Sequence, residues 1–143
     1  MASESLKYDF SMNIEKNRRA TFVDWPFDED DGSKCTSDKM AEAGFYHSPT
    51  DRDPDVARCF VCFKELEGWE PEDDPWQEHK KHSPRCTFLL TKNKNSEDIT
   101  IEEFLDIEVK RQENRVNKIL QNSIKEFEDI AKTVRTEMEK LVH

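Results

Sequence analysis

The chain has 143 residues, which is the size of one domain or of a small domain joined to an extended element. Charged residues make up 38% of it and hydrophobic residues only 34%, a ratio too polar for one large core. The net charge of -10 argues against binding nucleic acid, because neutralising phosphates requires lysine and arginine. A basic peptide or protein tail is a better match for this charge.

The sequence also argues against a membrane protein. No apolar run approaches the ~20 residues that span a bilayer, and no apolar segment follows a basic start. We therefore expect a soluble intracellular protein with no membrane contact. In a reducing compartment, four cysteines are more typical of metal ligands or free thiols than of disulfides.

Glycine and proline divide the chain into two halves. All three glycines and all six prolines lie at or before Pro84. The first half is therefore predicted to be a compact, turn-rich domain, and the second half to be helical.

Short elements are predicted in the first half, in chain order: a helix around Asn13–Arg19, a helix over Asp38–Ala43, strands at Arg58–Val61 and Glu67–Trp69, and a helix opened by Asp74-Pro75-Trp76. Thr36 or Ser37 can cap the second of these helices, and Gly44 ends it. Asp74 is the expected N-cap of the last helix, with Pro75 at its first position.

The second half begins with a capping box at Thr100–Glu103, flanked by Ile99 and Phe104 in staple positions. A helix of about 43 residues follows, ~64 Å long. Its apolar residues follow the 4-3 spacing of a coiled-coil seam: Leu120, Ile124, Phe127, Ala131, Val134, Met138 and Leu141. The seam either packs back on the domain or binds partner helices, and the length of the rod favours partners. The polar stretch Glu108–Lys118 is predicted to be solvated.

A metal site is indicated by cysteine and histidine spacing. Cys59 and Cys62 form a C-x2-C pair, and His79 and Cys86 follow with 16 and then 6 residues between them. A Cys₃His set is a closed tetrahedral site for zinc, which contributes folding energy and leaves no open position for catalysis. Spacing alone leaves His82 as an alternative histidine ligand. The remaining cysteine, Cys35, is predicted to be a free thiol.

A peptide-binding groove is indicated by acidic residues 65–78, which surround Trp69 and Trp76. One interpretation is a solvated acidic loop, and we adopt it for Glu70 and Glu78. The other is a strand edge that accepts the amine and basic side chains of an extended peptide. Two cationic residues nearby, Lys64 and His82, could receive a phosphate on that peptide.

The chain resembles the baculovirus IAP repeat of the inhibitor of apoptosis family over about residues 15 to 90. The resemblance is carried by Arg18, Thr21-Phe22, Trp25-Pro26, Ala43-Gly44-Phe45-Tyr46, Cys59-Phe60-x-Cys62, Leu66, Trp69, Asp73-Asp74-Pro75-Trp76-x-Glu78-His79 and Cys86. It implies an α+β fold, in which short helices surround a three-stranded antiparallel sheet and one structural Zn²⁺ is bound. It also places His79, and not His82, on the metal.

The implied organisation is an N-terminal segment (1–14), the zinc repeat (15–90), a linker (91–99) and a long helix (100–142). The chain most resembles family members that have one repeat, a long C-terminal helix and no RING finger. This resemblance implies a role in the chromosomal passenger complex. There the repeat would read the phosphorylated N-terminal tail of histone three at centromeres. The implied tail-binding residues are Asp53, Lys64, Glu65, Leu66, Glu67, Trp69, Asp73 and His82.

The same resemblance implies helical partners for the seam, namely borealin and the inner centromere protein, with Aurora kinase in the same complex. A homodimer is implied for the free protein, through Leu6, Phe10, Ile101 and Phe104. The implied locations are cytoplasm and nucleus, and the centromere, spindle and midbody during mitosis.

Other functional classes are weaker matches to the sequence. The wider family implies direct caspase inhibition or binding of Ala-started proapoptotic peptides, but only about 15 residues precede the repeat. A ubiquitin ligase needs a RING finger, and four cysteines are too few for one. No nucleophile–base pair or open metal site predicts an enzyme.

Overall fold

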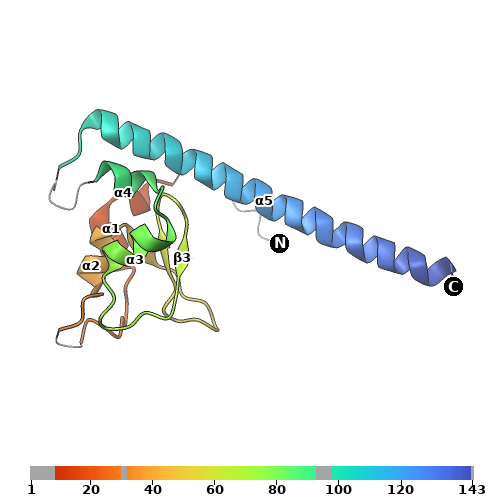
Figure 1. Cartoon of the computed structure of the whole chain (residues 1–143), viewed down its shortest axis with the longest axis horizontal. Helices are drawn as coiled ribbons and strands as arrows, with labels where there is room; N and C mark the ends of the chain where they lie inside the picture. Colours follow the sequence, from red (N-terminus) through yellow and green to blue (C-terminus); the bar gives the residue numbers. More distant parts are fainter. Residues whose placement is uncertain (1–8, 30–31, 93–97, 143) are drawn as a thin grey trace.

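The computed structural model describes residues 9–29, 32–92 and 98–142. Figure 1 shows a small domain beside one long helix that continues well beyond it. The elements in chain order are a 3-10 turn η1 (Ser11–Asn13), α1 (Glu15–Ala20), α2 (Ser37–Glu42), β1 (Phe45–His47), β2 (Ala57–Cys59), β3 (Glu65–Leu66), α3 (Pro75–His82), α4 (Thr87–Thr91) and α5 (Ile101–Val142).

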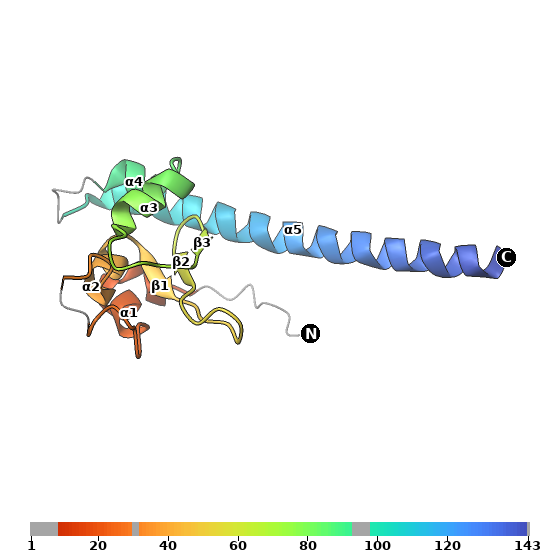
Figure 2. The same ribbon diagram turned by 60° about the horizontal axis from the view of Figure 1, so that its bottom comes forward.

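The sheet is antiparallel, with strand order β1-β2-β3. Phe45 pairs with Cys59, and Arg58 pairs with Glu65. Figure 2 shows α1, α2, α3 and α4 gathered around the sheet at the N-terminal end of α5. The predicted α+β fold, with short helices, a three-stranded sheet and a long C-terminal helix, is confirmed.

The third strand begins earlier than the sequence pattern predicts, at Glu65 instead of Glu67. The cause is the tight turn after β2, in which Phe63 has a left-handed backbone (φ 58°). This turn brings Lys64 back against Cys59, whose N–H donates to the Lys64 carbonyl at 3.0 Å. The third strand can therefore begin to pair with β2 at Glu65, two residues before the predicted start.

Helix α2 has one of the two predicted caps and the predicted terminating glycine, but it runs from Ser37 to Glu42, one residue earlier at each end than the predicted Asp38–Ala43. Thr36 accepts a side-chain hydrogen bond from the N–H of Lys39, and so it is the N-cap. Gly44, just past the helix, has φ 96°, and a Cβ there would lie 2.9 Å from the ring of Phe88. Glycine is required here both for its backbone conformation and for this close approach.

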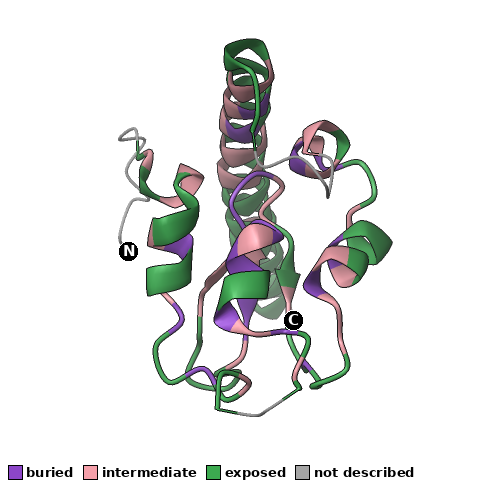
Figure 3. Cartoon of the chain, turned by 90° about the vertical axis from the view of Figure 1, so that its left-hand side faces the viewer, coloured by how far each residue is buried: buried purple, intermediate pink, exposed green. Residues whose placement is uncertain are grey.

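The core joins the sheet to the helices through aromatic and aliphatic side chains. Phe45, Met40 and Val61 are fully buried at its centre, and Figure 3 shows the buried positions of the domain facing inward. Arg18 is also buried, with its guanidinium 4.3 Å from the centre of the Phe60 ring. It donates hydrogen bonds to the carbonyl of Ala41 and to the carbonyls of Met12 and Asn13, so its charge is satisfied by backbone oxygens.

Helix α5 starts at the predicted capping box. The N–H of Thr100 donates to Glu103 Oε2 at 2.8 Å, and the N–H of Glu103 donates to Thr100 Oγ1 at 3.1 Å. Ile107, two turns into the helix, is only 3% exposed and joins the core. The first part of α5 is thus packed on the domain.

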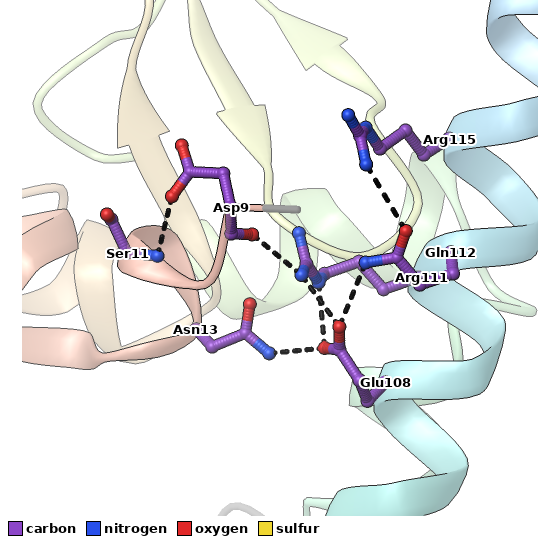
Figure 4. A network of polar contacts seen from close by, with 7 residues as sticks. All are labelled: Asp9, Ser11, Asn13, Glu108, Arg111, Gln112 and Arg115. Carbon is purple, nitrogen blue, oxygen red and sulfur yellow. Dashed lines mark hydrogen bonds and ion pairs between the residues drawn. The ribbon is translucent and has the colours of Figure 1, made fainter. Parts of the chain in front are cut away.

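Polar residues complete this packing (Figure 4). Glu108 accepts hydrogen bonds from Asn13, Arg111 and Gln112, and Arg111 also donates to the carbonyl of Asp9 at 2.8 Å. The prediction that Glu108–Lys118 is merely solvated is wrong. Four of its polar side chains bind backbone or side-chain groups outside the helix: Glu108, Arg111, Asn114 and Lys118.

The distal part of α5 leaves the domain. Its seam residues Leu120, Phe127 and Val134 are 54%, 72% and 50% exposed. The alternative in which this stripe packs back on the domain is therefore excluded for the described chain. Within the described residues, no helix is long and apolar enough to cross a membrane.

Candidate metal centre and peptide groove

The first two predicted metal ligands come from the turn that follows β2. Cys59 is the last residue of this strand, and its carbonyl accepts a hydrogen bond from the N–H of Phe63 at 3.0 Å. The left-handed Phe63 closes the turn and holds Cys62 close to Cys59. We call residues 59–64 the zinc knuckle.

The other two predicted ligands come from α3 and α4. Asp74 caps α3 through the N–H groups of Trp76 and Gln77, and Pro75 occupies the first turn, as predicted. His79 is the fifth residue of α3 and has no exposed surface. Cys86 is the N-cap of α4 and is also buried. One side chain from within α3 and one from the start of α4 are thus brought to the knuckle.

The ring of His79 is oriented by one hydrogen bond. Its Nδ1 lies 2.7 Å from the carbonyl oxygen of Ala43. A carbonyl can only accept, so Nδ1 carries the proton and Nε2 keeps its lone pair. That lone pair faces the sulfurs, as a metal-binding histidine requires.

The distances between donor atoms match a tetrahedral zinc site. Zn–S bonds of about 2.3 Å and Zn–N bonds of about 2.0–2.1 Å imply S···S separations of about 3.8 Å and S···N separations of about 3.6 Å. Cys59 Sγ lies 3.8 Å from Cys86 Sγ, and Cys62 Sγ lies 3.6 Å from His79 Nε2. All four donor atoms lie within 4.8 Å of one another.

The chemistry of the cluster also requires a cation. Burial raises the pKa of the Cys59 thiol well above its ordinary value, and the thiols of Cys62 and Cys86 beside it raise it further. Cys59 and Cys86 are buried and Cys62 is half-buried, so three thiolates this close together are stable only around a metal ion. The four residues are positioned to bind a single zinc ion, and the predicted ligand set is confirmed.

The alternative ligand His82 is not part of the cluster. It lies at the C-terminal end of α3, where its Nε2 is 3.3 Å from Glu78 Oε2. Cys35 is also separate, buried and free of any disulfide, and its Sγ donates to the carbonyl of Glu70. Burial raises the pKa of Cys35 to about 11, with Asp73 and Asp28 adding to the effect, so this thiol is unreactive at neutral pH.

A depression of about 330 Å³ lies beside the zinc knuckle. It is lined by Lys64, Glu65, Leu66, Glu67, Gly68, Trp69, Asp73, Glu78 and His82. Seven of the eight residues predicted to bind a peptide tail therefore lie around one hollow. We call it the acidic groove.

The eighth predicted residue, Asp53, is not among those that line the groove. It lies in the loop between β1 and β2, where its carbonyl accepts from the N–H of Thr50 and its own N–H donates to Thr50 Oγ1. Trp69 lies in the groove but is only 7% exposed. Its indole packs against Phe45 and donates to the carbonyl of Leu66, so most of it belongs to the core.

Sequence reasoning missed the role of Glu78 and treated it as solvated. Glu78 lines the groove and pairs with His82. The sequence did contain a signal for this pair, because Glu78 and His82 are four residues apart and such residues lie on the same face of a helix.

Helix α5 also reaches this region, which the sequence pattern did not indicate. Asn114 Nδ2 donates to the carbonyl of Val61 at 2.9 Å, and Lys118 Nζ donates to the carbonyl of Phe63 at 3.4 Å. Two carbonyls of the zinc knuckle are thus bound by side chains of the helix.

The residues predicted for a homodimer lie at the start of α5 and on the N-terminal segment. The rings of Phe10 and Phe104 meet edge to face, with centres 5.7 Å apart. Ile101 is 81% exposed. The fourth, Leu6, lies outside the described residues.

A small domain with a Cys₃His centre, a three-stranded sheet and an acidic groove defines a zinc-binding repeat of the IAP type. The family model described as BIR, the Inhibitor of Apoptosis domain, matches residues 18–90, and the chain belongs to this family. Over its whole length it is similar to Baculoviral IAP repeat-containing protein 5, also called survivin. Identity to the Mus musculus protein is 49% over 141 residues, which covers 99% of each chain.

Two further matches extend this comparison. Baculoviral IAP repeat-containing protein 5.2 of Xenopus tropicalis is 50% identical over 124 residues, which is 87% of this chain and 78% of that protein. A crystal structure of DIAP1 BIR1 bound to a Grim peptide matches with a TM-score of 0.48 and 34% identity. It covers 68% of this chain and 91% of that one. The predicted resemblance to the inhibitor of apoptosis family is confirmed by the family match and by these relatives.

Proposed function

We propose that this protein is a non-catalytic adaptor that reads the phosphorylated N-terminal tail of histone three and belongs to the chromosomal passenger complex. In that role it would act at centromeres in chromosome segregation and cytokinesis, and would contribute to suppression of apoptosis. It would move between cytoplasm and nucleus, and would reach the spindle and midbody during mitosis.

The observation that carries the proposal is the acidic groove next to an open strand. β3 is the edge strand of the sheet, and Glu65 and Leu66 that form it also line the groove. An extended peptide can add to such an edge, with its side chains entering pockets on alternate sides. Glu67 and Asp73 supply negative charge for the free amine of the first residue.

The cationic end of the groove supports a phosphate on the peptide. Lys64 and His82 line the same hollow, and a phosphothreonine would bring about -1.5 to -2 charges to them. His82 Nε2 is paired with Glu78 at 3.3 Å, so a phosphate bound through this nitrogen would replace one anionic partner by another.

The distal half of α5 supports the second part of the proposal. Its seam of seven apolar residues, six of them exposed and Ala131 half-buried, has the spacing of a helical bundle. We propose borealin and the inner centromere protein as the partner helices, with Aurora kinase in the same complex, and a homodimer through the Phe10–Phe104 region when these partners are absent.

The test is a titration of the intact protein with three free peptides: the phosphorylated histone tail, the plain tail and an Ala-started proapoptotic peptide. The proposal predicts the tightest binding for the phosphorylated tail. His82→Ala should weaken that peptide about tenfold and leave the plain tail unchanged. Lys81→Ala is the matched control, since it removes a cation from the same helix outside the groove.

The alternative function, a direct caspase inhibitor or reader of proapoptotic peptides, is an outcome of the same titration. A preference for the proapoptotic peptide, together with inhibition of a purified caspase, would favour it. Equal losses for both histone peptides in His82→Ala would overturn the phosphate role.

A further inference from the structure

One cationic side chain of α5, Lys118, lies close to an acidic residue that lines the acidic groove. Lys118 Nζ lies 3.8 Å from Glu65 Oε1 while it donates to the carbonyl of Phe63. One turn earlier, Asn114 donates to the carbonyl of Val61. These two bonds fix the helix against the zinc knuckle, so the fold sets the position of Lys118 beside Glu65, which lines the groove.

Glu65 already has another cationic partner from within the sheet. Arg58 is its register partner across the β2–β3 ladder, and Arg58 Nε donates to Glu65 Oε1 at 2.9 Å. Arg58 Nη2 contacts the same oxygen. Arg58 and Lys118 therefore both act on Oε1.

The Glu65 carboxylate is both charged and accessible. Burial raises its pKa, but the hydrogen bond and charge of Arg58 and the charge of Lys118 outweigh burial and lower it. The side chain is 43% exposed. An incoming cation can therefore reach a permanently ionised carboxylate at neutral pH, but it arrives beside two positive charges.

The two resident cations differ in how firmly they are held. Arg58 comes from the neighbouring strand, makes a two-nitrogen contact and is 28% exposed. Lys118 comes from a separate element, is 38% exposed and makes the longer contact. An exposed ammonium on a flexible stem gives up such a contact more easily than a guanidinium in a strand pair. Arg58 thus positions Glu65, and Lys118 is the cation that competes.

We propose that Lys118 is a specificity-determining residue of the acidic groove, which weakens binding of peptides that place a basic side chain on Glu65. The inference rests on the proposed function, because it concerns the same groove, where the family resemblance implies that Glu65 would hold an arginine side chain of the same tail. The long helix then takes part in peptide selection as well as in assembly.

The test uses Lys118→Met in the intact protein and two tail peptides that differ at one position. One peptide carries the native arginine, and the other carries citrulline, which has nearly the same shape and no charge. Lys118→Met should bind the arginine peptide about two to five times more tightly than the wild-type protein does. Binding of the citrulline peptide should not change, and the gain should disappear in ~1 M salt.

Lys125→Met is the matched control. It removes the same charge from the same helix two turns further on, at an exposed position. Neither peptide should gain affinity from this substitution. Equal gains for Lys118→Met and Lys125→Met, or equal gains for both peptides, would overturn the inference because they indicate a general effect of net charge.

A measurement without peptide gives an independent readout. Carbon-13 NMR titration of the Glu65 carboxyl should show a higher pKa in Lys118→Met than in the wild-type protein and in Lys125→Met. An unchanged pKa contradicts the inference even if the peptide data agree with it. Failure of the wild-type protein to bind either peptide would overturn the proposed function and the inference together, whereas wild-type binding without a Lys118 effect would overturn the inference alone.

Discussion

Asn114 of α5 donates a 2.9 Å hydrogen bond to the backbone carbonyl of Val61, 53 residues earlier in the chain and next to the zinc ligand Cys62. The long helix is therefore attached directly to the turn that carries the metal. Val61 is fully buried, so its carbonyl has limited access to water if the amide is removed.

Asn114→Ala should consequently lower the free energy of unfolding by about 1–3 kcal/mol, the cost of a buried acceptor without a partner. Urea unfolding of the zinc-loaded protein measures this. Asn117→Ala is the control, since Asn117 is exposed on the same helix and its substitution should change stability by less than about 0.5 kcal/mol. Equal effects of the two substitutions would show that the Asn114–Val61 bond contributes nothing.

The sequence predicted a solvated stretch where the structure has this contact, and the reason is physical. Asn114 and Lys118 bind backbone carbonyls, and a carbonyl has no signature in the sequence. Apolar spacing reveals contacts between side chains, but it does not reveal polar side chains that satisfy a distant turn. The same limit applies to Glu108, whose partners come from both ends of the chain.

The zinc ligands, in contrast, could be predicted in full. The C-x2-C pair fixes two sulfurs on one turn, and motif context selects His79 over His82. Spacing alone could not make that choice, because it depends on which ring the Ala43 carbonyl orients toward the sulfurs. The exposed distal seam was also predictable, since a helix of this length extends beyond the surface of a small domain. Trp69 was predicted to bind the peptide tail but is mostly core, because sequence does not reveal how deeply an aromatic is buried.

The Glu108 cluster should make the protein sensitive to acid. Burial raises the pKa of Glu108, but hydrogen bonds from Arg111, Gln112 and Asn13 and the charge of Arg111 outweigh it, and the net result is a pKa lowered to about 2. A carboxyl whose pKa is depressed by folding stabilises the folded state above its unfolded pKa of about 4.5. That contribution should be lost as the pH falls from about 4.5 to about 2.

Glu108→Gln tests this pH dependence, because the amide keeps the shape and removes the charge. The variant should be less stable than the wild-type protein by about 1–3 kcal/mol at pH 7, and the difference should shrink steadily below pH 4.5. Thermal unfolding between pH 2 and 7 gives the comparison, with the exposed Glu128→Gln as control. A difference that stays constant down to pH 2 would contradict the assigned ion pair.

Zinc content should separate the two neighbouring histidines of α3. His79 is oriented toward the sulfurs, whereas His82 pairs with Glu78 outside the cluster. His79→Ala should retain no stoichiometric zinc and should unfold at a much lower temperature, because a structural metal contributes folding energy directly. His82→Ala should keep one zinc per chain and an unchanged melting temperature. Atomic absorption and calorimetry on the two variants decide the assignment, and loss of zinc from His82→Ala would overturn it.

The distal seam should be required for partner binding and dispensable for the zinc repeat. Phe127 and Val134 are 72% and 50% exposed on the part of α5 that leaves the domain. Replacing both by glutamate would place two charges in an apolar helix interface, and this should weaken assembly with partner helices more than about 100-fold. Zinc content should be unaffected, since the seam lies beyond the residues that contact the knuckle.

Thr133→Glu with Thr136→Glu is the matched control for the seam. It adds the same two charges to the opposite face of the same helix segment, where both threonines are exposed. Size-exclusion chromatography with light scattering should show assembly for this control and none for the seam variant. If the seam variant still assembled, the partner helices would have to contact another face of α5, and the 4-3 apolar spacing would have no role in binding.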